Sequence, residues 1–326
     1  MRDLATLPKA HLHIHLESTI RPETLWEIGT ANGIDVPREA PAFTGFRDFA
    51  DYNALLRECL CRPEDFERIA REFCEDEAAQ GTRYAEVTFT AASHTERLGE
   101  PDMPLASVLK GLSKGGAEHG LEWRVLLDHS RRRSVERAQR TLDLALRHAD
   151  EGVFGIGMAG EEKYPIAPFA AVCDQAHEAG LHLVHHAGED AGPDSIREAL
   201  DVGHSERLGH GIRILEDPEL VARVRDEGIA LEVCPSSNVT LGLVPSLAEH
   251  PLPRLIDAGL TVTLNTDVPS VTGTTLTDEY ARARTTFGYD DATLAHLARA
   301  SFDASFAPAA TKKAAHADID AWLATP

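Results

Sequence analysis

The sequence predicts a closed (β/α)8 TIM barrel, because three features of the 326-residue chain agree on that fold. Eight short apolar runs are separated by segments with helical periodicity, which is the pattern of parallel βα units. The length suits one large α/β barrel. Reactive polar residues follow the ends of several runs, at the edge where barrel enzymes carry their active sites. The predicted strands are 11–16, 84–90, 122–129, 153–159, 182–187, 207–212, 230–235 and 260–267.

Helices are expected between these strands because apolar residues recur there at intervals of three and four. The clearest are 63–79, 134–149, 168–179, 194–201 and 218–227, and several are followed by glycine, a common helix stop.

Two regions interrupt the alternation of strands and helices. Segment 43–60 is rich in Phe, Tyr and Leu and predicts a helical insertion after the first strand, which either covers the active face or packs on the flank of the barrel. Segment 290–326 predicts C-terminal helices that close the barrel from outside. No repeat or linker divides the chain, so residues 1–326 are expected to form a single domain.

The amino-acid composition argues against some classes of binding partner and predicts a cellular location. A formal net charge of −21 argues against nucleic acid or an anionic membrane surface as a partner, because a negative field repels both. The five cysteines show no framework spacing, the N-terminus lacks a basic region followed by an apolar run, and no apolar run is long enough to span a bilayer. These features predict a cytoplasmic protein. They do not predict an oligomeric state.

The first predicted strand, in the stretch HLHIHLEST (11–19), carries histidines at alternate positions. Alternate side chains of a strand leave the same face, so His11, His13 and His15 are expected to form one row. Two imidazoles in such a row can bind one metal ion, although an isolated HxH more often marks an ordinary polar face. His11 lies deeper in the predicted barrel, where packing or a hydrogen bond is expected.

Polar residues at the ends of other strands favour the metal site. His186 ends the fifth predicted strand and Asp267 ends the eighth, and side-chain alternation directs both into the barrel. Together with His13 and His15 they give a nitrogen and oxygen ligand set for one zinc ion, although iron, manganese and cobalt also fit. A bound divalent ion lowers the pKa of water to about 7 and makes it a nucleophile at neutral pH.

Two further residues are candidates for proton transfer. His210, at the end of the sixth strand, is a candidate base and orienting group, and its alternative is a buried histidine bonded to a backbone carbonyl. Glu189 lies just beyond the fifth strand, where its carboxyl group can reach the metal site, although a carboxylate is also favoured at the start of a helix.

At these residues the sequence resembles the adenosine deaminase family of the amidohydrolase superfamily. The resemblance lies in LPKAHLHIHLESTIRPETL, YAEVTF, GIGMAGEE, HHAGED, RLGHGIR, LEVCPSSNV, LNTDVPS and TTLTDEY, in that order over nearly the whole chain.

The resemblance implies a role for each matching residue. His13, His15, His186 and Asp267 would bind zinc, Glu189 would donate a proton to a ring nitrogen, and His210 and Asp267 would assist the attacking water. It further implies that the backbone amide of Gly160 meets a purine ring nitrogen and that Glu17 meets a sugar hydroxyl. The implied reaction replaces the 6-amino group of a purine base or nucleoside with oxygen and releases ammonia.

Two positions depart from the family pattern. Val268 stands where a second aspartate usually contacts the five-membered ring of the purine, and Ser18 stands where glycine usually follows the acidic residue. Valine makes no such hydrogen bond, and a buried unpaired group costs about 1–3 kcal/mol. Either a neighbouring group replaces these contacts, or the substrate is not plain adenosine. The candidates are adenine, aminodeoxyfutalosine, an N6-substituted adenine or a deaza analogue.

Two other functions remain open at the level of sequence. A metal-dependent amidohydrolase of another cyclic substrate would use the same activated water without needing Glu189 to protonate a ring. A non-catalytic nucleoside-binding relative would not need the complete ligand set.

Overall fold

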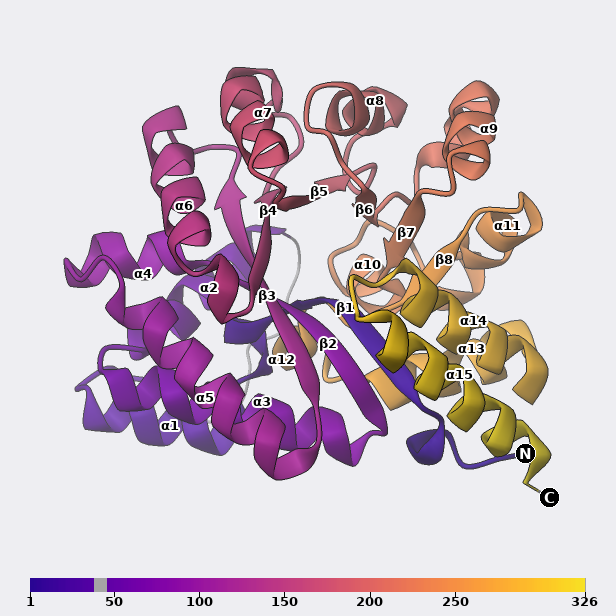
Figure 1. Ribbon diagram of the computed structural model, residues 1–326, viewed down its shortest axis with the longest axis horizontal. Coiled ribbons are helices and arrows are strands. Elements are labelled where there is room, and N and C mark those ends of the chain that lie inside the picture. Colours follow the sequence, from indigo (N-terminus) through magenta and orange to yellow (C-terminus); the bar gives the residue numbers. More distant parts are fainter. Residues whose placement is uncertain (38–45, 326) are drawn as a thin grey trace.

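The computed structural model describes residues 1–37 and 46–325, and within these residues eight parallel strands form a barrel surrounded by helices (Figure 1). Each strand pairs with the next one in the chain, in the order β1 to β8. The strands are β1 (Lys9–His15), β2 (Thr82–Phe89), β3 (Glu122–Ser130), β4 (Val153–Ala159), β5 (His182–Ala187), β6 (Arg207–His210), β7 (Ala230–Val233) and β8 (Val262–Leu264). The predicted (β/α)8 barrel is confirmed.

The seam between β8 and β1 closes the barrel through a few specific contacts. His15 donates its backbone N–H to the carbonyl oxygen of Asp267 at 2.9 Å, and Asp267 donates its own to the carbonyl oxygen of His13 at 3.0 Å. Below these bonds the side chain of Asn265 accepts hydrogen bonds from the backbone of Leu12 and His13. A side-chain oxygen therefore replaces part of the backbone ladder at the seam.

The strands β6, β7 and β8 are shorter than predicted, and two site residues at or beyond the ends of β6 and β8 have an unusual backbone conformation. His210 follows Gly209 at the end of β6 with φ at 65°, and Asp267 lies beyond β8 with φ at 63°. This left-handed conformation is uncommon for residues other than glycine.

Helices cover the outside of the barrel (Figure 1). Several begin at side-chain caps that satisfy free backbone N–H groups, such as Ser134 before α6 and Asp217 before α9. The helices are α1 (Pro22–Ala31), α2 (Phe46–Cys59), α3 (Pro63–Ala79), α4 (Ala91–Leu98), α5 (Met103–His119), α6 (Val135–Arg147), α7 (Ala170–Glu178), α8 (Pro193–Asp201), α9 (Pro218–Asp226), α10 (Pro235–Thr240), α11 (Leu252–Asp257), α12 (Pro269–Thr272), α13 (Leu276–Phe287), α14 (Asp291–Ala304) and α15 (Ala309–Ala324).

The predicted insertion is helical and reaches the active face. Three helices, α1 to α3, lie between β1 and β2, and residues 43–45 of the predicted segment lie outside the described residues. Helix α2 contributes Ala54 and Arg57 to the lining of the cavity at the carboxyl ends of the strands. Of the two placements considered for this segment, the structure has the one at the active face.

The C-terminal helices close the barrel from outside, as predicted. Helix α14 packs against β1 and β8, over the seam. The segment after α14 enters the other end of the barrel, where Phe306 packs against Leu126, Phe154 and Val184. Across residues 1–37 and 46–325, no helix has both the length and the hydrophobicity needed to traverse a bilayer.

The prediction that His11 shares a face with His13 and His15 is wrong. The pairing of β1 with β2 shifts register between His11 and Ile14, so one extra residue on β1 breaks the alternation. The ring of His11 instead contacts Glu77 of α3 at 3.0 Å and Thr266 at 3.1 Å. The expected hydrogen-bonding role of His11 is confirmed.

Candidate functional site

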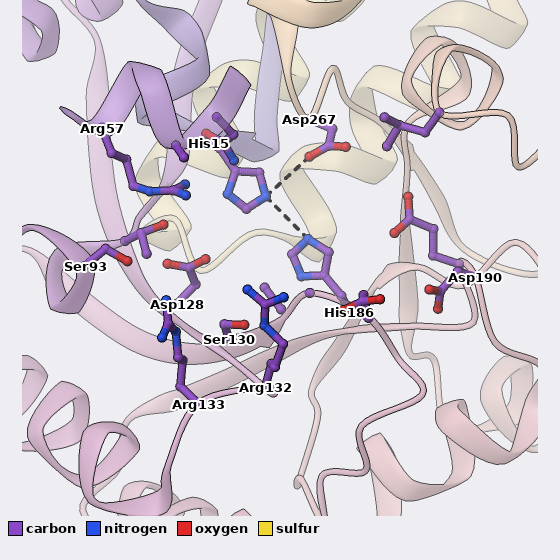
Figure 2. Close-up of a pocket in the computed structure, with 18 of the residues that line it drawn as sticks. His15, Arg57, Ser93, Asp128, Ser130, Arg132, Arg133, His186, Asp190 and Asp267 are labelled. Atoms are coloured by element: carbon purple, nitrogen blue, oxygen red, sulfur yellow. Dashed lines mark hydrogen bonds and ion pairs between the residues drawn. The ribbon is translucent and has the colours of Figure 1, made fainter. Parts of the chain in front are cut away.

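Five side chains from four strand ends converge at the carboxyl end of the barrel. One ligand atom from each of His13, His186, His210 and Asp267 lies within 4.8 Å of the others. His15 belongs to the same cluster, because its Nε2 atom lies 3.4 Å from Nε2 of His186 and 3.3 Å from Oδ1 of Asp267. Figure 2 shows the ring of His15 directed toward both of these groups. The structure therefore brings together all four predicted metal ligands and His210.

The spacing and chemistry of these atoms fit a divalent metal ion. Ligand atoms bound to a tetrahedral ion at about 2.0–2.1 Å lie roughly 3.4 Å from one another, which is the separation of the His15 and His186 nitrogens. The Nε2 atom of His13 is buried and has no hydrogen-bond partner among the described residues. An unpaired buried nitrogen is costly unless it binds something, and the ligand set suits zinc.

A buried network fixes the ring of His13. Its Nδ1 atom lies 2.9 Å from Oε2 of Glu232 on β7, so Nδ1 donates and Nε2 keeps its lone pair. Glu232 in turn accepts a hydrogen bond from Arg207 on β6, which also pairs with Glu86 on β2. The ion pairs lie inside the barrel, directly beneath the cluster, and hold His13 in the tautomer that can bind a metal.

A second chain of hydrogen bonds gives His210 the opposite tautomer. The backbone N–H of Leu252 donates to Nδ1 of His250, so His250 donates from Nε2 to Oδ1 of Asn238 at 3.2 Å. The amide nitrogen of Asn238 therefore donates to Nδ1 of His210 at 3.3 Å, which leaves the proton of His210 on Nε2. Burial lowers the pKa of His210 to about 3, so its ring is neutral.

The contrast between the two tautomers separates the roles of His13 and His210. Nε2 of His13 offers a lone pair to the cluster, whereas Nε2 of His210 offers a proton. A metal ion binds the lone pair of His13, whereas an oxygen atom accepts a hydrogen bond from His210. His210 is therefore suited to donate a hydrogen bond within the site.

Asp267 receives its own support from α10. The hydroxyl group of Ser237 donates to Oδ2 at 2.6 Å, which leaves Oδ1 facing His13 and His15. Burial alone would raise the pKa of Asp267, but the close approach of His13 and the neighbouring histidines outweighs burial and lowers this pKa. The carboxylate is charged at the centre of the cluster.

Glu189 lies beside this cluster in a half-buried position. Its Oε1 atom lies 3.5 Å from Nε2 of His210 and accepts a hydrogen bond from Asn238 at 3.3 Å. Burial and the charge of Asp267 raise its pKa well above the ordinary value for glutamate. The carboxyl group can therefore hold a proton at neutral pH.

The loop that carries Glu189 is held by a second glutamate. Glu162 accepts hydrogen bonds from the backbone N–H groups of Gly188 at 2.7 Å, Glu189 at 2.7 Å and Asp190 at 2.9 Å. Three bonds to one buried carboxylate fix the direction in which the side chain of Glu189 leaves the backbone. Glu162 is therefore a positioning residue for Glu189.

The cluster opens into a cavity of about 410 Å³. Gly160 lines this cavity, and the contact of its amide with a purine nitrogen stays a prediction. Glu17 and Val268 are both buried and are not among the lining residues. The carboxylate of Glu17 accepts hydrogen bonds from Thr90 and His94, and Val268 packs in the hydrophobic core. A direct substrate contact by either residue stays a prediction.

Sequence reasoning missed several residues that support or line the site. Glu232 is an acidic residue within the otherwise apolar strand segment LEV, and Asp128 directly follows the apolar run VLL, and both were usable signals. Asn238 lies in the quoted motif CPSSN, and Glu162 lies in the quoted motif MAGEE, but neither spacing indicates what the side chain contacts.

Comparison with known proteins agrees with the geometry. The adenosine deaminase family model matches residues 8–322. An adenine deaminase of Streptomyces coelicolor is 38% identical, over 93% of this chain and 91% of that protein. The crystal structure of an adenine deaminase from Arthrobacter aurescens superposes with a TM-score of 0.93 at 33% identity, covering 98% of this chain and 99% of that one.

A further solved structure contains a metal. An amidohydrolase from Burkholderia ambifaria with bound zinc superposes with a TM-score of 0.89 at 26% identity, covering 98% of this chain and 93% of that one. The barrel, the convergent histidine and aspartate side chains and the match over nearly the full length lead to one conclusion. The chain belongs to the adenosine deaminase family.

Proposed function

We propose that this hydrolytic purine deaminase acts on a free 6-aminopurine base and that adenine is its preferred substrate. We further propose that it uses one zinc ion held by His13, His15, His186 and Asp267. The reaction converts adenine and water to hypoxanthine and ammonia. The observation that carries the proposal is the approach of His15 to both His186 and Asp267, at 3.4 and 3.3 Å. Another divalent transition ion with the same preference for nitrogen and oxygen ligands could replace zinc.

Each polar group of the site has a part in this reaction. The metal, when bound, lowers the pKa of water and so supplies a nucleophile at neutral pH. Glu189 gives its proton to N1 of the purine, which makes C6 electrophilic. His210 donates a hydrogen bond from Nε2 to the oxygen that adds to C6, and Asp267 accepts a proton or hydrogen bond from the same oxygen. The two protons of the consumed water end on the 6-amino group, which leaves the tetrahedral carbon as ammonia, and on Glu189, which regains the proton that it gave to N1.

Two observations support a free base over a nucleoside. Similar proteins from Streptomyces coelicolor and Arthrobacter aurescens are named adenine deaminases. Glu17, the residue implied to bind a sugar hydroxyl, already accepts hydrogen bonds from the Thr90 backbone and from His94. Gly160 is proposed to donate its backbone N–H to N3.

The test measures ammonia release by the metal-free protein and by protein reloaded with zinc, manganese, iron or cobalt. The substrates are adenine, adenosine, deoxyadenosine, AMP, N6-methyladenine and a cyclic amide. We expect a metal-dependent reaction that prefers adenine. Release of ammonia from adenosine but not from adenine would overturn the choice of substrate, and hydrolysis of the cyclic amide alone would overturn the deamination itself.

A further inference from the structure

Asp128 lines the substrate cavity and has a buried carboxylate oxygen without a hydrogen-bond partner among the described residues. The residue lies near the end of β3, is 7% exposed and lines the cavity together with Ser130. Its Oδ1 atom has no hydrogen-bond partner among the described residues. Figure 2 shows Asp128 on the same wall as Arg57 and Ser93, across the cavity from Asp190. The role proposed for Glu189 does not use Asp128.

The buried Oδ1 atom of Asp128 needs a hydrogen-bond donor. A buried polar group left unpaired costs roughly 1–3 kcal/mol, and more when it is charged. Burial raises the pKa of Asp128, whereas His15, the Thr90 side chain and Arg57 act to lower it. Because Asp128 lines the cavity that is proposed to hold the substrate, the substrate itself can supply the missing hydrogen bond.

The order of groups around the cavity indicates which part of a purine would reach Asp128. Asp128 and Ser130 are two residues apart on β3 and so leave the same face of the strand. A Cβ atom added at Gly160 would lie 3.2 Å from the hydroxyl oxygen of Ser130, so Ser130 borders Gly160 directly. If N1 meets Glu189 and N3 meets Gly160, the next polar atom along that edge of the purine is N9.

We propose that Asp128 accepts a hydrogen bond from N9–H of a free purine base and thereby selects against purines substituted at N9. The inference rests on the proposed function and identifies one residue that sets its substrate class. A free base carries a proton on its five-membered ring, whereas a nucleoside or nucleotide carries a sugar at N9. A free base therefore donates a hydrogen bond to the carboxylate of Asp128. A nucleoside leaves this carboxylate unpaired, and its sugar collides with the side chain.

The experiment compares adenine with 9-methyladenine in the zinc-loaded wild-type protein and in Asp128→Ala. The wild type is expected to prefer adenine. In the variant, kcat/KM for adenine should fall about 10- to 100-fold while that for 9-methyladenine is retained or rises. Asp51→Ala removes an exposed carboxylate from the same cavity and should leave the ratio of the two substrates unchanged.

Binding of the product separates this inference from the proposed function. Calorimetry with hypoxanthine and 9-methylhypoxanthine measures the same discrimination without turnover, so it remains informative if adenine is not deaminated. Zinc content and thermal unfolding report whether each variant is folded, and Asp128→Asn, which keeps an oxygen acceptor, should show an intermediate loss. An equal fall for both ligands, or an unchanged ratio, would overturn the role of Asp128.

Discussion

The Nε2 atom of His250 lies 3.2 Å from the side-chain oxygen of Asn238, and this contact sets the direction of the Asn238 amide. The amide nitrogen then points toward both Glu189 and His210, at 3.3 Å from each. Burial lowers the pKa of His250 to about 4, so the ring stays neutral and donates from Nε2. A residue remote from the proposed substrate thus determines which nitrogen of His210 carries the proton.

Asn238→Asp should lower kcat about 10²-fold, because a carboxylate oxygen would replace the N–H donor and repel Glu189. The stability of the fold should change less, since the new side chain has nearly the same shape. Steady-state ammonia release measures kcat. Asn53→Asp, at the cavity mouth, makes the same chemical change without touching either residue and should stay within a few-fold of the wild type. Equal activity of Asn238→Asp and Asn53→Asp would show that the amide of Asn238 does not orient Glu189 and His210 for the reaction.

Glu189→Gln should lower kcat by about 10²–10⁴-fold, because glutamine cannot deliver a proton to the purine ring. Metal content should remain close to that of the wild type, because Glu189 is outside the proposed ligand set. Elemental analysis beside a kinetic assay separates these two effects. Glu216→Gln, exposed near the same rim, is the matched control. Substantial turnover of adenine by Glu189→Gln would remove Glu189 from the proton-transfer step.

Glu232→Gln should weaken zinc binding about 10- to 100-fold, because it removes the carboxylate that accepts from His13 Nδ1. Competition with a chelator measures the affinity. Glu206→Gln disrupts a similar contact, to His182 at the start of β5, and should leave zinc affinity unchanged. An unaltered affinity in Glu232→Gln would show that the tautomer of His13 does not depend on this bond.

Lys9 predicts a pH dependence of stability that is unrelated to catalysis. The side chain is buried at the start of β1, where it donates to the carbonyl oxygens of Leu4 and Leu7. Burial lowers its pKa to about 7, and the charges of Glu77 and Asp3 only partly oppose this effect. The unfolded chain therefore binds more protons than the folded one between about pH 7 and pH 10, so this residue makes stability rise with pH.

Lys9→Met should remove that rise. The difference in the free energy of unfolding between wild type and variant should grow in favour of the wild type by up to about 1.4 kcal/mol per pH unit in this range. Urea titrations at several pH values measure it. Lys110→Met changes an exposed lysine and should give a constant difference. A pH-independent difference for Lys9→Met would show that the folded pKa of Lys9 is not depressed.

The sequence by itself determined the barrel and the identity of the clustered residues. Eight apolar runs separated by amphipathic segments allow few arrangements other than parallel βα units, and the carboxyl ends of such strands meet at one edge. That rule placed His13, His15, His186 and Asp267 together before any distance was known. The helix predicted over residues 63–79 is also confirmed, because the spacing of its apolar residues alone decides which face of the helix is buried.

Only the tertiary structure decided the finer features, because each depends on contacts between segments distant in the chain. The register shift in β1 took His11 out of the row of histidines, and no local pattern indicates a bulge. Asp267 reaches the cluster through a left-handed backbone rather than through strand alternation. The tautomers of His13 and His210 follow from Glu232 and Asn238, which come from other strands and loops. Hydrogen-bond direction is a property of the assembled barrel, so it cannot be read from spacing alone.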